Sequence, residues 1–445
     1  MTTTPPSLRS ALRSLPDQAQ EPTVNDLFVP TLLRELGFQQ DEIFSQYKTG
    51  NGAEAVDKAA RKTIGDDIFI HTKSEPYLLV ELKGRDINLS DDTVKYYQTV
   101  SQLKRYLLAP NCHTVQWGII TNSCHIQLFR KHGKVVFPAT QCISLNEDNI
   151  EEVVASIRKK IENPNKALTL AVYNNKGGVG KTTTTVNLAG ILTYLGKKVL
   201  AIDFDPNQQD LTHSLGLPLS NSVVFKALTD RDATLQSAIH LFSFKSGKTS
   251  LKFDVVTADL KLTEEPDHIL AGEIKIDSLY RKLELLKQEY DYILIDSPPN
   301  WKLFSKLSLY AADAILMPTK HNNLFSLENA ATAIKKFIPE VRALKVDGSP
   351  IALPIFFNGE KITQPKLEVA QKEINKIINT ARKDKIDLLP YFYPKYTNAK
   401  KDLHIHQIPS YANIADAAFS RIPAVYKDKS ANDYYKHLAK EYFIQ

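Results

Sequence analysis

The feature that most constrains the fold of this chain is an apolar strand, a glycine-rich loop and a helix in direct succession. Residues 168–173 read Leu-Thr-Leu-Ala-Val-Tyr, residues 174–183 read Asn-Asn-Lys-Gly-Gly-Val-Gly-Lys-Thr-Thr, and residues 182–195 hold good helix formers without proline. A phosphate-binding loop requires this context. Glycines let backbone N–H groups converge on phosphate oxygens, and the helix N-terminus adds positive potential. The sequence therefore predicts a nucleotide-binding α/β domain.

Within this loop, Lys181 is expected to neutralise charge on the outer phosphates, and Thr182 to place its hydroxyl on Mg²⁺. The ordinary loop pattern has glycine six positions before that lysine, where this chain has Asn175. The residues expected to contact the nucleotide are Lys176, Gly177, Gly178, Val179, Gly180, Lys181, Thr182 and Thr183.

Two later segments end in carboxylates that suit the same site. Residues 197–205 read as a strand ending in Asp203 and Asp205, and residues 291–296 as an apolar strand ending in Asp296. We expect Asp203 and Asp296 to hold Mg²⁺, directly or through its water shell. One aspartate-ended strand could equally cap a helix. Their order after the glycine-rich loop favours a single metal–phosphate site.

The run Lys-Gly-Gly-Val-Gly-Lys-Thr over 176–182 resembles the deviant Walker A loop of the ParA/MinD family of ATPases. This resemblance implies a doubly wound, mostly parallel sheet over residues 167–445, with ATP and Mg²⁺ as ligands. It also implies an ATP-bound homodimer in which Lys176 reaches the partner's nucleotide. Asp205 would orient the attacking water.

The resemblance continues downstream with expected strands at 311–319 and 351–357. Asn358 follows the second of these, where related ATPases keep an adenine-contacting asparagine; a plain turn asparagine is the alternative. Residues 206–209 read Pro-Asn-Gln-Gln where family members often read Pro-Gln-Gly-Asn, so the details of this switch loop stay open.

Basic residues gather between positions 361 and 401, where ten Lys or Arg face four acidic residues. The periodicity over 365–383 predicts a helix with an apolar inner face. Its outer face and the segment after it carry five lysines, namely Lys372, Lys376, Lys383, Lys400 and Lys401. Such lysines bind DNA phosphates without reading sequence. A solvated helix face is the alternative; the ParA resemblance, to a family that binds DNA nonspecifically, favours DNA.

The N-terminal part reads as a separate α/β domain over residues 21–162. It ends in a charged helix, 146–162, and the Asn-Pro-Asn-Lys linker 163–166 follows. Residues 1–20 are rich in Thr, Pro and Gln and are expected to form a flexible tail.

A β-hairpin is expected in this domain, with strands at 67–71 and 77–83. Alternation along the strands would place Asp67, Glu81 and Lys83 on one face, with Asp66 as an alternative first carboxylate. Two carboxylates chelate Mg²⁺, and a lysine beside them stabilises developing negative charge or helps to deprotonate water. Surface-charged hairpins often show this pattern by chance.

Three further segments support a resemblance to the PD-(D/E)xK nuclease domains of type I restriction enzyme motor subunits. Gln102 and Tyr106 match a Gln-x-x-x-Tyr helix motif, residues 116–129 resemble the next two strands, and Glu21 resembles an extra acidic residue. The resemblance implies a restriction-endonuclease-like fold. Inactivated members of that superfamily serve as DNA-binding modules, so activity is a separate question.

Composition excludes several classes of protein. With 43% hydrophobic and 24% charged residues, the chain of 445 residues has ordinary globular composition. Neither a membrane span nor an export signal is expected. The three scattered cysteines suit a reducing cytosol, and His404 and His406 are interpreted as surface or strand histidines. A nitrogenase-like reductase fits poorly, because the C-terminal part has no cysteine.

Two hypotheses follow for a cytoplasmic, nucleoid-associated protein without membrane contacts. In the first, a ParA-type ATPase carries a Mg²⁺-dependent endonuclease acting on plasmid, phage or chromosomal DNA. In the second, a partition ATPase positions DNA, and its N-terminal domain only binds DNA or a partner. A ParB-like or other activator protein is a possible partner in either case.

Overall fold

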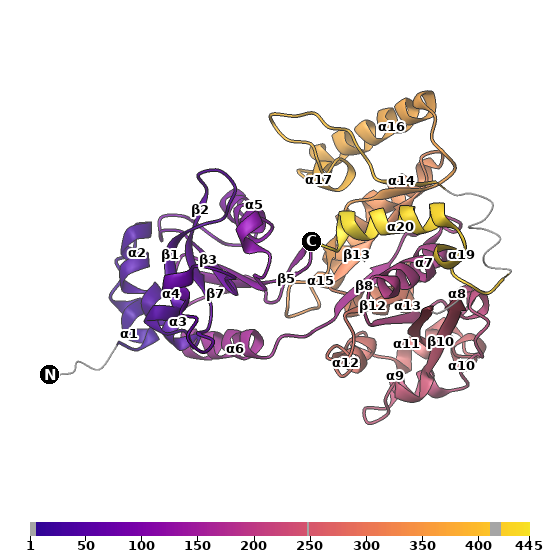
Figure 1. Cartoon of the computed structure of the whole chain (residues 1–445), viewed down its shortest axis with the longest axis horizontal. Coiled ribbons are helices and arrows are strands. Elements are labelled where there is room, and N and C mark those ends of the chain that lie inside the picture. Colours follow the sequence, from indigo (N-terminus) through magenta and orange to yellow (C-terminus); the bar gives the residue numbers. More distant parts are fainter. Residues whose placement is uncertain (1–5, 247–248, 410–419) are drawn as a thin grey trace. The chain divides into compact units, whose positions relative to one another are not determined.

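The computed structural model describes residues 6–246, 249–409 and 420–445, and the chain divides into two compact units (Figure 1). The N-terminal unit comprises Met1–Pro164 with Val346–Gly348 and Gln445, and the C-terminal unit comprises Asn165–Lys345 and Ser349–Ile444. Within the described ranges, no helix combines the length and apolarity needed to span a bilayer.

A mixed seven-stranded sheet forms the centre of the N-terminal unit. Its order is β1-β2-β3-β4-β5-β6, and β7 also pairs with β5. The strands are β1 Ile43–Lys48, β2 Ala55–Ala60, β3 Leu78–Leu82, β4 Trp117–Thr121, β5 His125–His132, β6 Val135–Pro138 and β7 Ile143–Ser144. Only β3 and β4 are parallel. A parallel pair needs a crossover connection, and α5 provides it.

Helices cover both faces of this sheet. They are α1 Leu8–Arg13, α2 Glu21–Leu27, α3 Val29–Glu35, α4 Phe69–Thr72, α5 Val94–Leu107 and α6 Ile150–Glu162, with short 3₁₀ turns η1 Gln40–Glu42 and η2 Pro110–Cys112. One core joins α1, α2, α3 and α6 to Leu78, Val80 and Leu82, and the other joins α5 to Leu79. Because side chains alternate along β3, these cores lie on opposite faces.

The prediction of a flexible tail over residues 1–20 is wrong for residues 6–20, the part of it that the structure describes. Ser7 caps α1 by accepting a hydrogen bond from the Ser10 amide, and Leu8, Leu12 and Leu15 are buried in the first core. A leucine every three or four residues forms one apolar stripe on a helix, and its burial fixes the segment. Residues 1–5 lie outside the described part.

The C-terminal unit is built on a second seven-stranded sheet, ordered β10-β11-β9-β12-β8-β13-β15. Its strands are β8 Leu168–Val172, β9 Val199–Asp203, β10 Ile239–Ser246, β11 Thr249–Val256, β12 Tyr292–Asp296, β13 Ala314–Leu316 and β15 Ile351–Ala352. All neighbours are parallel except β10, which is antiparallel to β11. The mostly parallel α/β architecture expected from the sequence is confirmed.

The strands of this sheet are apolar on both sides because helices cover both faces. Ala171 and Ile293 belong to a core shared with α9, α12 and α13, whereas Leu188 and Ile191 of α7 lie outside it. The helices are α7 Lys181–Tyr194, α8 Asp210–Ser214, α9 Val223–Thr229, α10 Lys261–Glu264, α11 Asp267–Glu273, α12 Ser278–Glu284, α13 Leu303–Ala311, α14 Leu324–Thr332, α15 Ile338–Arg342, α16 Gln364–Lys383, α17 Leu389–Phe392, α19 Ala424–Lys427 and α20 Lys429–Tyr442.

A small parallel sheet, β14-β16-β17, stands beside the large one. It contains β14 Pro318–Thr319, β16 Phe356–Gly359 and β17 Gln407–Pro409. The single strand expected at 351–357 is therefore wrong, because this segment contributes β15 to one sheet and β16 to the other. The helix expected at 365–383 is confirmed as α16, with Ala370, Ile374, Ile378 and Ala381 buried.

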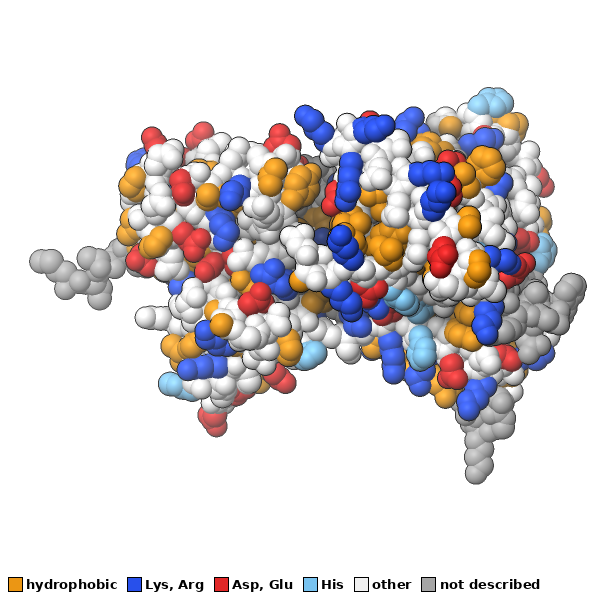
Figure 2. Space-filling model, turned by 90° about the horizontal axis from the view of Figure 1, so that it is seen from above, with side chains coloured by type: hydrophobic (Ala, Val, Ile, Leu, Met, Phe, Trp, Pro, Cys, Tyr) orange, Lys and Arg blue, Asp and Glu red, His pale blue; other side chains and the backbone are white. Residues whose placement is uncertain are grey.

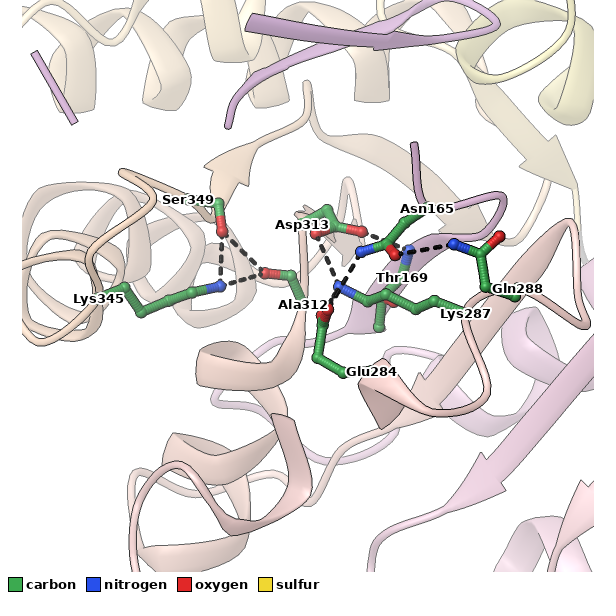
Figure 3. A network of polar contacts seen from close by, with 9 residues as sticks. All are labelled: Asn165, Thr169, Glu284, Lys287, Gln288, Ala312, Asp313, Lys345 and Ser349. Atoms are coloured by element: carbon green, nitrogen blue, oxygen red, sulfur yellow. Dashed lines mark hydrogen bonds and ion pairs between the residues drawn. The ribbon is translucent and has the colours of Figure 1, made fainter. Parts of the chain in front are cut away.

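A buried polar network anchors the segment after α12 to the large sheet (Figure 3). The Lys287 ammonium lies 2.8 Å from Glu284 Oε1 and 3.5 Å from Asp313 Oδ1, and Asp313 Oδ2 accepts a hydrogen bond from the Thr169 amide of β8. Burial alone lowers the pKa of Lys287, but Asp313 and Glu284 more than offset this and raise it. The ammonium is therefore a fully paired structural charge.

Candidate functional site

The glycine-rich loop connects the end of β8 to the start of α7. Gly178 and Gly180 have φ angles of 71° and 85°, a region that side-chain-bearing residues adopt only with strain. A Cβ added to Gly177 or Gly178 would meet no atom within 4 Å. The loop thus keeps an open side at the N-terminus of α7, where phosphate oxygens are stabilised.

The two residues that begin α7 face the acidic strand ends. The Lys181 ammonium donates to the Lys176 carbonyl at 3.1 Å, and the Thr182 hydroxyl donates to Asp296 Oδ2 at 2.6 Å. Burial lowers the pKa of Lys181, although Asp296 and Asp205 act in the opposite direction. Thr183 is half-buried, and its carbonyl accepts a hydrogen bond from Asn187.

Asp203 and Asp296 lie directly opposite each other on the adjacent parallel strands β9 and β12. Burial raises the pKa of Asp296, and the neighbouring Asp203 raises it further. Burial also raises the pKa of Asp203 to about 6. Asp203 Oδ2 accepts hydrogen bonds from the Thr212 amide and hydroxyl, whereas Oδ1 is buried without a hydrogen-bond partner. Two close carboxylates and a threonine hydroxyl are the hard oxygen donors that suit Mg²⁺.

Asp205, Lys176 and Asn358 lie around the same loop. Asp205 is buried and accepts a hydrogen bond from the Gln208 amide at 3.3 Å, and burial raises its pKa. The Lys176 ammonium is 5.9 Å from the ring centroid of Phe325. Asn358 Nδ2 donates to the Val179 carbonyl at 3.1 Å, so this side chain contacts the phosphate loop itself. The contact of Asn358 with adenine stays a prediction. So do the roles of Asp205 in orienting water and of Lys176 in reaching the partner's nucleotide.

In the N-terminal unit, the prediction that a strand at 67–71 forms a hairpin with β3 is wrong. Residues 69–72 form α4, and the strand paired antiparallel with β3 is β2. Asp67 precedes α4 and forms a two-pronged ion pair with Arg61, at 2.7 Å for each oxygen. Its carboxylate is thereby committed to a buried guanidinium. The carboxylate that strand pairing brings next to Glu81 is therefore Asp57 and not the expected Asp67.

Asp57 lies in β2 opposite Glu81, since the flanking pair Lys58–Val80 is in register. Its Oδ2 accepts a hydrogen bond from the Leu82 amide at 2.8 Å. Asp57 is not among the site residues expected from the sequence. The run Ala-Val-Asp-Lys-Ala-Ala over 55–60 sets a single carboxylate among small apolar residues, and this is the local signal that could have identified it.

Three charged residues lie close to Asp57 and form one group with it, namely Glu81, Lys83 and Glu21. The Lys83 ammonium lies 2.6 Å from Glu81 Oε1 and 3.7 Å from Glu21 Oε2. Burial and the nearby Asp57 raise the pKa of Glu81 to about 7. Burial lowers the pKa of Lys83, but Glu81 and Glu21 more than offset this and raise it. The ammonium therefore stays protonated and suits charge stabilisation better than proton abstraction.

Gln102 and Tyr106 lie on α5, which packs against the sheet face that carries Leu79 and, two residues further, Glu81. Gln102 Nε2 donates to the Tyr106 hydroxyl at 2.8 Å, and Tyr106 is buried. A hollow of about 200 Å³ borders the centre, lined by Glu21, Pro22, Asn25, Ser45, Gln46, Asp57, Lys58 and Leu82. Across the described ranges, no group of three or more His, Cys, Asp or Glu side chains has the arrangement of a metal site.

The five lysines predicted to contact DNA are all exposed. Lys372, Lys376 and Lys383 lie on α16, and Lys400 and Lys401 follow α17. Lys376 pairs with Glu373 at 2.7 Å and Lys400 with Asp402 at 3.5 Å. Figure 2 views the molecule from the α16 side and shows several Lys and Arg side chains on that face of the C-terminal unit.

Comparison with known families matches each unit separately. Residues 167–346 match an AAA domain family, here of the ParA/MinD-like ATPase type, and residues 20–139 match the type I restriction enzyme R protein N terminus.

Individual relatives resemble the C-terminal unit. The sporulation initiation inhibitor protein Soj of Bacillus subtilis is 37% identical over 153 residues, which is 34% of this chain and 57% of Soj. The chromosome partitioning protein ParA of Myxococcus xanthus is 35% identical, over 34% of this chain and 50% of that protein. An uncharacterized Pseudomonas putida protein is 33% identical, over 41% of this chain and 68% of its own length. The chain thus spans half to two thirds of these relatives.

Among solved structures, an ATP complex of a Cyanothece McdA variant aligns with 63% of this chain and 99% of its own chain. The TM-score is 0.47 and the sequence identity is 19%.

Proposed function

Because the chain belongs to the ParA/MinD family of ATPases and carries a type I restriction enzyme N-terminal domain, we propose that it is an ATP-hydrolysing, ATP-dimerising DNA-binding protein with a Mg²⁺-dependent DNA endonuclease domain. One observation carries this proposal. The same chain holds a Lys181–Thr182–Asp296 group at a phosphate loop and an Asp57–Glu81–Lys83 group on one sheet face. We place the protein in the cytoplasm, at the nucleoid.

At the nucleotide site, the loop amides and Lys181 would bind the phosphates of ATP. Thr182, Asp203 and Asp296 would hold Mg²⁺, which when bound neutralises phosphate charge. Asp205 would orient the attacking water. Positioning and charge neutralisation supply most of the rate in such reactions. Intrinsic turnover should be slow until DNA or a ParB-like activator orders the switch loop.

Dimerisation would depend on Lys176, which is half-buried and directly precedes the exposed Gly177 and Gly178. Its ammonium would leave its position near Phe325 and neutralise the partner's nucleotide. ATP would thereby favour a pair of protomers, and each pair would carry two nuclease domains.

At the nuclease-like centre, Asp57 and Glu81 would hold Mg²⁺, which when bound acts as a Lewis acid on the phosphodiester. Lys83, kept protonated by Glu81 and Glu21, would stabilise the negative charge that develops on the phosphate. Glu21, 45% exposed at the rim, would face the entering strand.

The DNA-binding surface would be the exposed lysines of α16. Replacing Lys372 and Lys383 by alanine should weaken binding to duplex DNA of any sequence. The slope of log K against log[salt] should fall in magnitude by about 1.8, roughly 0.9 for each lost phosphate contact. The matched control replaces the exposed Lys159 and Lys160 of α6. An unchanged slope in the α16 variant would leave these lysines as a solvated face.

A second candidate function is DNA positioning without cleavage. The relatives named above include proteins described as chromosome partitioning and sporulation initiation inhibitor proteins, which favours it. In that case the N-terminal domain would serve only to bind DNA or a partner.

The two functions separate in one experiment. Purified protein is incubated with plasmid and linear DNA plus Mg²⁺, with and without ATP, beside Glu81→Ala and Lys181→Ala variants. Cleavage that Glu81→Ala abolishes supports the endonuclease. Intact DNA in every lane, with ATP-dependent retardation in gels, supports positioning instead.

A further inference from the structure

Gln46 has an unusual backbone conformation in the middle of β1. Its φ angle is 53°, although β1 pairs with β2 in regular register on both sides, at Ser45–Lys58 and Tyr47–Val56. A left-handed conformation costs free energy for any residue with a Cβ, and within a strand it also interrupts the ladder. Gln46 is exposed, so no burial of its side chain offsets this cost.

The strained residue stands directly across the ladder from Asp57. Gln46 Nε2 donates a hydrogen bond to Asp57 Oδ1 at 3.2 Å, while the Leu82 amide occupies Oδ2 at 2.8 Å. Both oxygens of this carboxylate are therefore held, one from each neighbouring strand. The carboxylate is fixed in one orientation.

Gln46 also lines the hollow at the candidate nuclease centre, together with Asp57, Lys58 and Glu21. Ser45 and Lys58, the ladder pair next to Gln46, also line the hollow. The Lys58 ammonium donates a hydrogen bond to Ser45 Oγ at 2.7 Å. Strained residues persist where the surroundings impose the conformation, and they cluster at functional sites. At Gln46, the strained backbone is accompanied by the hydrogen bond from its side chain to Asp57.

We propose that Gln46 is a positioning residue of the nuclease-like centre, whose amide orients Asp57 for binding a divalent cation. This inference rests on the proposed endonuclease function. Groups that hydrogen-bond to a metal-binding carboxylate commonly change metal affinity by about 10–100-fold when removed.

The test compares Gln46→Gly with the parent protein, free of nucleotide. Glycine adopts positive φ without strain, so the melting temperature of the N-terminal unit should rise by roughly 2–4 °C. At the same time, the Mg²⁺ concentration for half-maximal DNA cleavage should rise about 10–100-fold. Calorimetric Mg²⁺ affinity should fall by the same factor. A residue with a purely structural role would not change stability and cation affinity in opposite directions.

Glu75→Gly is the matched control, because Glu75 is exposed in the same unit, has a φ of 54° and lies outside the hollow. It should raise the melting temperature without changing the Mg²⁺ requirement. Unchanged Mg²⁺ affinity in Gln46→Gly, a lower melting temperature, or no Mg²⁺ binding by the parent would overturn the inference. A parent that binds Mg²⁺ but cuts no DNA would instead refute the endonuclease function, while calorimetry still tests Gln46.

Discussion

At the scale of single residues, Arg61 and Asp67 form a two-pronged ion pair. The Arg61 side chain is 6% exposed, and its guanidinium lies 5.5 Å from the Phe69 ring centroid. The hydrogen bonds from Arg61 lower the pKa of Asp67 to about 2. Without this carboxylate, a buried cation would lose its main partner.

We therefore expect opposite results for two aspartate variants of the N-terminal unit. Asp57→Asn should reduce DNA cleavage at least about 100-fold, because several kcal/mol of metal-assisted stabilisation are lost, and should leave folding intact. Asp67→Asn should lower the midpoint of urea unfolding and keep cleavage in the folded protein. Cleavage assays and denaturation monitored by circular dichroism measure both effects. The reverse outcome would restore Asp67 as the first carboxylate.

His406 is expected to make the stability of the C-terminal unit depend on pH. Its ring stands edge-on to Tyr442, its Nε2 is buried without a hydrogen-bond partner, and burial lowers its pKa to about 4. The unfolded chain takes up a proton near pH 6.5, before the folded protein does. The contribution of His406 to the unfolding free energy is therefore fully present above pH 6.5, and it is lost as the pH falls from 6.5 toward 4.

The expected loss between pH 7.5 and pH 5.5 is about 1.4 kcal/mol from this residue. His406→Phe should remove that part of the pH dependence, as measured by urea unfolding at both pH values. His404→Phe is the control, since His404 is exposed. Equal pH dependence in the His406 variant and the parent would contradict the assignment.

At the scale of elements, the segment after α12 is held by a buried ion pair to Asp313, which precedes β13 and bonds to β8. Lys287 and Asp313 have side chains only 4% and 8% exposed. Removing one partner of a buried pair leaves an uncompensated charge, so Lys287→Ala should cost about 3–5 kcal/mol of unfolding free energy.

Lys302 offers a matched control in the same unit, because its pair with Asp267 is 65% and 43% exposed. Lys302→Ala should cost less than about 1 kcal/mol. Urea denaturation of both variants measures the contrast. Equal losses would show that the network in Figure 3 contributes no more than a surface pair.

At the scale of the whole molecule, ATP binding and pairing of protomers are expected to depend on two different lysines. Lys181 is 8% exposed at the start of α7, whereas Lys176 is half-buried and precedes the glycines of the loop. In an Asp205→Ala background, which is expected to block hydrolysis, Lys176→Ala should keep ATP binding and lose the nucleotide-dependent dimer. Calorimetry and light scattering after size exclusion measure the two properties.

The exposed Lys197, in the turn after α7, is the control for this charge change. Lys197→Ala should dimerise with ATP as the parent does. A parent protein that binds ATP but remains a single protomer would remove the basis for ATP-gated DNA binding and for paired nuclease centres.

The sequence alone determined those parts of this protein whose structure depends on residues close to one another along the chain. The phosphate loop joins one strand to one helix without interruption, so glycine placement and apolar runs predict its fold. The α16 helix is equally local, because its buried positions Ala370, Ile374 and Ile378 follow the helical repeat. A short-range pattern is sufficient wherever the interacting residues are close along the chain.

Only the tertiary structure decided which carboxylate joins Glu81 and Lys83. Asp57 and Asp67 both precede β3 and both lie in segments compatible with a strand. Strand pairing selects Asp57, because β2 packs its apolar residues into both cores while residues 69–72 close into a helical turn. Alternation along one strand fixes its faces but not its partner, and the partner is chosen by packing between segments distant in sequence.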